Sequence, residues 1–130
     1  MSTEENKAVV RRFIDAFHRS DAAAFREVAA PDLAKVAIEE WMPRNDAEWA
    51  DQRLEITEMM AEGDWVWARM ASGGRQVGEW KGLPPTGRTA TETGIGFMRV
   101  SGGKVVEFSA IFDELDTVQQ LGGVVSPGGK

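Results

Sequence analysis

The chemistry open to this chain is limited by the side chains that it lacks. The sequence has no cysteine, no tyrosine and one histidine, His18, among its 130 residues. Without cysteine there is no thiol nucleophile and no zinc–thiolate site, and one histidine cannot build a histidine metal cage. We therefore expect no metal site, and any acid or base must come mainly from carboxylates, lysine, arginine or His18.

Glu92 is the strongest acid–base candidate, because it lies on the inward side of a predicted strand. Desolvation there would raise the pKa of its carboxyl group toward the range useful for proton transfer. The alternative is that Glu92 lies at an open, solvated rim. Asp113 suits the N-cap of a C-terminal helix, and His18 suits the C-terminal end of the first helix, so we assign both structural roles.

Two N-terminal helices are expected to position these groups. Ser2 and Glu5 form a capping-box pattern, and apolar residues at helical spacing follow as far as about Arg19. Ser20 or Asp21 then caps a second helix that ends before Pro31. Beyond it we expect a short helical piece over 36–41, an interruption at Pro43, and a new cap at Asn45.

The second half of the chain has the pattern of antiparallel strands. Turn residues bound predicted strands over 54–61, 65–72, 75–80, 88–100 and 104–113, followed by a helix over 114–121. Helices followed by strands predict an α+β fold with an antiparallel sheet. We expect a single domain over 1–121 and a flexible, glycine-rich tail over 122–130.

Alternation along the last two strands predicts which side chains face inward. The even positions of the last strand are Val106, Phe108, Ala110 and Phe112, and the even positions of its partner include Glu92, Gly94, Gly96 and Met98. Glycines within a strand leave space beside it, so a hollow next to Gly94 and Gly96 is one interpretation. Bulges that bend the sheet are the other, and the two are compatible.

Five tryptophans in a chain of this length could form aromatic walls, which bind flat apolar ligands. Trp41 and Trp49 are expected at the pocket rim, whereas Trp65 and Trp67 have core or subunit-interface alternatives. Arg69 shares strand parity with Trp65 and Trp67, and we weigh substrate contact equally against pairing with Asp113 or Glu107. The predicted substrate-binding set is Trp41, Trp49, Trp65, Trp67, Arg69, Gly94, Gly96, Met98, Phe108, Ala110 and Phe112.

The charge balance limits the partners. A net charge of −6 and a pI near 4.8 argue against nucleic acid and anionic membranes, which need clustered lysine and arginine. The apolar stretches are short, and the N-terminal residues are acidic and polar, unlike a signal peptide. We expect a cytoplasmic protein that binds a small molecule.

Two motifs resemble the SnoaL-like polyketide cyclases of the nuclear transport factor 2-like fold. They are the stretch GRQVGEWKGLPPTGR over 74–88, and the GKVVE strand start at 103–107 followed by QQLG at 119–122. The resemblance implies a cone of curved antiparallel sheet closed by N-terminal helices. It also implies an enzyme without a cofactor, a deep apolar pocket, and a homodimer or tetramer.

The catalytic residues of that family are not retained. The resemblance places Ala110 where the aldol cyclases carry an acid–base aspartate, and Phe108 where they carry a histidine. Gly94 and Gly96 occupy polar positions of the neighbouring strand, and Gln76 replaces a further histidine. These substitutions predict a pocket with fewer polar groups that accepts an apolar polyene or polycycle.

Three functions remain open. The first is a cyclase that closes a ring of a polyketide-like chain by confinement, for example a [4+2] cycloaddition, if residues 94, 96, 108 and 110 face one enclosed apolar chamber. The second is acid–base chemistry by relocated carboxylates, either aldol cyclisation or epoxide opening. The third is a carrier that binds a lipophilic metabolite without changing it.

Overall fold

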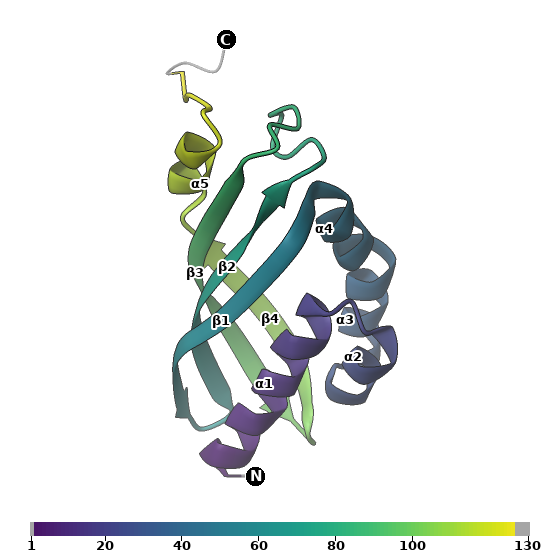
Figure 1. The fold of residues 1–130 in the computed structure, drawn as a ribbon. Helices are drawn as coiled ribbons and strands as arrows, with labels where there is room; N and C mark the ends of the chain where they lie inside the picture. Colours follow the sequence, from purple (N-terminus) through teal and green to yellow (C-terminus); the bar gives the residue numbers. More distant parts are fainter. Residues whose placement is uncertain (1, 127–130) are drawn as a thin grey trace.

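The computed structural model describes residues 2–126 and has the predicted α+β architecture. One four-stranded antiparallel sheet, in the order β1-β2-β3-β4, packs its inner face against the N-terminal helices. Helix α1 lies across the sheet and the next helices stack along one side, while α5 sits at the opposite end of the molecule from the N-terminus (Figure 1). No helix within residues 2–126 is long and apolar enough to span a membrane.

Helix α1 (Thr3–His18) begins with the predicted capping box. Glu5 N donates to Ser2 Oγ at 3.1 Å, and Ser2 N donates to Glu5 Oε1 at 2.9 Å. The predicted apolar stripe is its packed face, since Val9, Val10 and Phe13 are buried in the core. Phe17 and His18, in the last turn of α1, line a cavity between this helix and the sheet.

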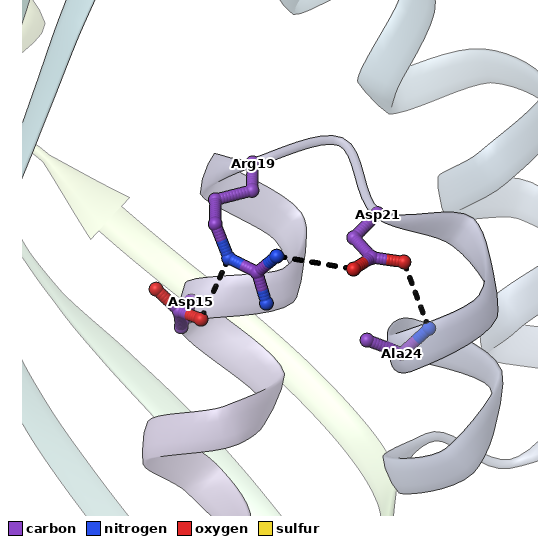
Figure 2. Close-up of polar contacts among 4 residues, drawn as sticks. All are labelled: Asp15, Arg19, Asp21 and Ala24. Atoms are coloured by element: carbon purple, nitrogen blue, oxygen red, sulfur yellow. Dashed lines mark hydrogen bonds and ion pairs between the residues drawn. The ribbon is translucent and has the colours of Figure 1, made fainter.

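Arg19 and Asp21 shape the turn into α2 (Ala22–Val28), as Figure 2 shows. Arg19 Nε donates to Asp15 Oδ2 at 2.8 Å, and its Nη1 donates to Asp21 Oδ2 at 3.0 Å. The other oxygen of Asp21 accepts from Ala24 N at 3.1 Å, so Asp21 is the N-cap. The Ala24 N–H, together with Arg19, holds the pKa of Asp21 below its ordinary value.

The helical segment over residues 31–48 corrects the sequence-based prediction. Pro43 does not interrupt it: α3 (Pro31–Val36), a π-helical turn η1 (Ala37–Trp41) and α4 (Met42–Glu48) are continuous. Met42 N donates to Ala37 O, five residues back, and this wider turn accommodates the proline ring and its missing N–H. Asn45 consequently lies inside α4 and caps nothing.

The strands are β1 (Trp49–Glu62), β2 (Trp65–Gln76), β3 (Thr89–Ser101) and β4 (Lys104–Phe112). The predicted break between strands at Gly73 and Gly74 is wrong, because β2 runs through both glycines and pairs there with β1 and β3. A Cβ on Gly74 would lie 3.3 Å from the Cβ of Trp49, so the absence of a side chain lets this tryptophan pack directly on the strand.

Helix α5 (Glu114–Gln120) closes one side of β3. Asp113 is its N-cap as predicted, with Asp113 Oδ1 accepting from Asp116 N at 3.2 Å. Gln120 extends the sheet edge: its Oε1 accepts from Thr91 N and its Nε2 donates to Thr91 O, both at 2.8 Å. The flexible tail expected over 122–130 stays a prediction, since residues 127–130 lie outside the described part of the chain.

Removing the cap of α5 tests how far this short helix depends on it. Asp113→Ala should lower the free energy of unfolding by about 1 kcal/mol, because the N–H of Asp116 loses its acceptor. Urea denaturation measures the change. Asp113→Asn keeps an acceptor oxygen and should restore most of the loss, and equal stability of the alanine variant and the parent would contradict this role.

Candidate functional site

A cavity of about 670 Å³ opens between the helices and the inner face of the sheet. Its walls come from the end of α1, the η1–α4 segment, the start of β1, the end of β2, the start of β3, the end of β4 and α5. This volume is in the range of natural small-molecule sites. The lining divides into an aromatic wall and a polar end, which have different chemistry.

The aromatic wall lies where α1, α2 and η1 meet β4. The Phe13 ring centroid lies 4.7 Å from that of Phe25 and 5.6 Å from that of Phe108. Trp41 completes the wall, with its ring centroid 6.0 Å from Phe108. Rings at these separations form a rigid apolar surface suited to a flat, unsaturated ligand.

The polar end contains Glu92, which β3 carries on its inner face. Glu92 is half-buried in the cavity wall, so it is not a freely solvated rim residue. Burial raises the pKa of its carboxyl group to about 7 from an ordinary value of 4.5, and the negative charges of Glu114 and Asp113 add to the rise. Lys81 and a hydrogen bond with the Thr117 side chain oppose it. The carboxyl group can therefore both accept and donate a proton near neutral pH.

A second carboxylate and a lysine share this end of the cavity. Burial raises the pKa of Glu48, against the opposing charges of Arg44 and Lys81. Lys81 Nζ forms an ion pair with Glu114 Oε2 at 2.6 Å. Lys81 thus lies among three carboxylates, those of Glu48, Glu92 and Glu114, all of which line the cavity.

The structure brings five of the predicted site residues together at this cavity: Trp41, Trp49, Glu92, Phe108 and Phe112. It separates three others from it. Trp65, Trp67 and Arg69 project from the outer face of the sheet, where both tryptophans are exposed. The expected pairing of Arg69 is also corrected, since its partner is Glu58, with Arg69 Nη1 lying 3.7 Å from Glu58 Oε1.

The space beside the strand glycines is filled. A Cβ on Gly94 would lie 2.4 Å from Phe112 Cδ1, so the Phe112 ring rests on the bare backbone. A Cβ on Gly96 would meet the methyl group of Met70 at 3.1 Å and the sulfur of Met98 at 3.3 Å. Ala110 pairs with Gly96 on this inner face. The expected hollow at Gly94 and Gly96 is therefore corrected: the cavity lies nearer Glu92, and its lining includes polar groups.

Gln76 holds the loop that borders the polar end. It is fully buried, and its Nε2 donates to Gly78 O and Leu83 O, both at 3.1 Å. Its Oε1 accepts from Thr86 N at 3.1 Å and from Thr86 Oγ1 at 2.7 Å. All the hydrogen-bonding groups of the amide are satisfied within the loop, so Gln76 is structural and does not face a ligand.

Several cavity residues were not predicted from the sequence, namely His18 as a lining residue, Arg44, Asn45, Glu48, Gln52, Ser72, Lys81, Glu114 and Thr117. Trp41, Asn45 and Glu48 are spaced four and three apart, which indicates one helix face. That pattern spans Pro43, and a proline within a helical pattern predicts an interruption. No sequence rule of comparable strength predicts the π-helical turn that accommodates this proline.

The chain matches a known protein family over most of its length. The SnoaL-like polyketide cyclase family matches residues 7–121, which is most of the chain. The chain belongs to this family. The expected family, the fold and the assignment as a cyclase enzyme are therefore confirmed.

Two relatives are named aklanonic acid methyl ester cyclases. The chain is 30% identical to AcmA of Streptomyces galilaeus, over 91% of each chain. It is 31% identical to DnrD of Streptomyces peucetius, over 94% of this chain and 92% of that one. Among solved structures, TsrD from Streptomyces laurentii superposes with a TM-score of 0.85 at 22% identity, covering 95% of this chain and 99% of the other, and supports the fold alone.

The proton on Glu92 gives a direct test of the polar end. Because the folded-state pKa is about 7 and the ordinary value is 4.5, the folded protein binds this proton more tightly than the unfolded chain. The contribution of Glu92 to stability is therefore fully present below pH 4.5 and should be lost as the pH rises to about 7. Chemical denaturation at a series of pH values measures it. Glu92→Gln should reduce the change of the free energy of unfolding with pH in this range. An unchanged pH dependence in this variant would contradict the burial of Glu92.

Proposed function

We propose that the enzyme closes a ring in a flat, polycyclic polyketide ester by intramolecular aldol addition, with Glu92 as the general acid and base. The observation that carries the proposal is the position of Glu92 in a cavity with an aromatic wall, with a pKa of about 7. The two relatives named as aklanonic acid methyl ester cyclases support the substrate class.

Glu92 would act twice in one turnover. Its ionised carboxylate takes a proton from the carbon next to a substrate carbonyl, and the C–H electron pair becomes the C=C bond of an enolate. The enolate carbon attacks a ketone of the same molecule and forms the new C–C bond. The protonated Glu92 then returns its proton to the resulting alkoxide, so the carboxylate is regenerated and the atoms balance.

The aromatic wall would supply the folding of the substrate. Trp41 and Phe108 are partly exposed and lie against the buried Phe13, so a planar substrate could stack on them while its reacting carbonyls reach Glu92. Holding both reacting ends of one molecule together lowers the entropic part of the barrier. The chamber expected at Gly94 and Gly96 is filled, so the second candidate, ring closure by confinement alone, including a [4+2] cycloaddition, would have to use this aromatic wall.

Replacing Glu92 separates the two candidates. With aklanonic acid methyl ester as the trial substrate, acid–base catalysis predicts that Glu92→Gln lowers kcat by about 100-fold or more. The parent rate should rise as Glu92 ionises through pH 7, and the variant should lose that dependence. Product formation measured by chromatography across pH checks both.

Glu107→Gln is the matched control, because Glu107 is exposed on β4 and pairs with Arg99, outside the cavity lining. It should leave the rate and its pH profile unchanged. Confinement instead predicts a small effect of Glu92→Gln and loss of activity when a residue of the cavity lining is enlarged, as in Ser72→Leu. A substrate that binds and remains unchanged after long incubation would indicate a carrier.

We also propose that two copies associate through the outer face of the sheet. Met60, Trp65, Trp67, Ile95 and Ile111 are exposed there on four neighbouring strands, with Ile111 69% and Met60 60% accessible. Trp67 and Phe97 pack edge to face at 4.8 Å between ring centroids. Two pairs of charged neighbours, Glu58 with Arg69 and Arg99 with Glu107, neutralise each other and reduce the repulsion between two like surfaces. Contiguous apolar patches of this kind mark interaction surfaces.

A charge placed at the centre of this patch should disrupt the association. Trp67→Glu should shift the mass measured by multi-angle light scattering from a dimer or tetramer to a monomer, because a buried unpaired carboxylate is costly. Glu55→Gln, on β1, is a control that should keep the parent mass. A monomeric parent protein would overturn the proposal.

A further inference from the structure

A tight turn holds Lys81 in an unusual backbone conformation. Trp80 N donates to Leu83 O at 3.0 Å and Leu83 N donates to Trp80 O at 2.8 Å, so Lys81 and Gly82 are the central residues of a two-residue turn. Their φ angles are 50° and 80°, which is the left-handed pattern of a type I′ turn. Glycine, asparagine and aspartate favour this conformation, whereas lysine adopts it at a cost of about 1 kcal/mol.

The turn directs the lysine to the cavity. Lys81 lines it together with Glu92, and its Nζ lies 2.6 Å from Glu114 Oε2 and 5.7 Å from the centre of the Trp80 ring. The side chains of Lys81 and Glu114 are each 50% accessible to solvent. An ion pair this exposed contributes little to stability, so it does not explain why a lysine occupies a strained turn position.

We propose that Lys81 is a second catalytic residue, whose ammonium group leaves Glu114 to hold the negatively charged oxygen that forms when Glu92 removes a proton from the substrate. This inference rests on the proposed aldol reaction. The cation lines the same cavity as the base, so its ammonium group can donate a hydrogen bond to an oxygen that becomes negatively charged there.

The step balances without another reactant. When the carboxylate of Glu92 takes the proton, the carbonyl π electrons move onto oxygen, and the ammonium group of Lys81 donates a hydrogen bond to that oxygen. When the enolate carbon attacks the ketone, the charge moves to the new alkoxide, which takes the proton from Glu92. Lys81 keeps its own protons throughout and returns to Glu114.

A phenol that resembles the enolate tests the role of Lys81 without turnover. We would titrate 2-hydroxyanthraquinone bound to the protein, because its absorption moves to longer wavelength when the phenol ionises. The parent protein should lower the pKa of the bound phenol relative to the free dye. Lys81→Met should raise the bound pKa by about one unit, and Lys81→Arg should restore most of the shift.

Lys81→Asn separates this role from folding. Asparagine suits the left-handed turn, so the urea midpoint should stay equal or rise while the stabilisation of the phenolate is lost. Glu114→Gln is the matched control, because it removes the ion pair and leaves the cation. This variant should keep or enlarge the shift in the phenol pKa.

The outcomes distinguish the two proposals. The inference is wrong if the parent protein does not bind the dye, or binds it without lowering the pKa of the phenol. It is also wrong if Glu114→Gln loses the pKa shift as Lys81→Met does. In these cases the role of Lys81 is limited to holding the loop through its ion pair with Glu114. If instead the dye behaves as expected while Glu92→Gln retains the full cyclisation rate, the aldol reaction fails and the oxyanion site at Lys81 remains.

Discussion

The structure depends on the pairing of β3 between β2 and β4. This register puts Glu92, Gly94, Gly96 and Met98 on one face, turned toward the helices, and leaves Ile95 and Phe97 on the other. A shift by a single residue would exchange the two faces, moving the carboxylate to the outside and the exposed hydrophobic residues to the cavity. Gln120 secures the register at the start of β3, since it pairs with both backbone groups of Thr91.

The space between the helices and the inner face of the sheet is apolar in one region and carries carboxylates in another. Phe112, Met70 and Met98 fill the space beside Gly94 and Gly96, so this region is apolar and packed. Glu48, Glu92 and Glu114 lie with Lys81 at the other end, near the loop that Gln76 holds. An aromatic substrate skeleton and its reacting oxygens would thus meet separate regions of one cavity.

Much of this arrangement follows from local sequence rules. The capping box at Ser2 and Glu5, the cap at Asp113, and the inward parity of Glu92, Phe108 and Phe112 depend on short-range patterns, and the structure retains all of them. The tertiary contacts were less predictable. Residue type alone predicts the same role for Trp67 as for Trp41, namely part of an aromatic wall. Only the pairing of β2 with β3 shows that Trp67 faces outward. The position of Lys81 was not predictable either, because it depends on a left-handed turn conformation that lysine disfavours.

The π-helical turn η1 gives the polar wall tolerance to a change in chain length. The hydrogen bond from Met42 N to Ala37 O closes a turn that is one residue longer than an α-helical turn, so the extra residue is absorbed inside the turn. Arg44, Asn45 and Glu48 therefore face the cavity as they would in a regular α-helix that is one residue shorter. Loss of one residue from η1 would restore α-helical hydrogen bonding and leave both these cavity contacts and the sheet in place.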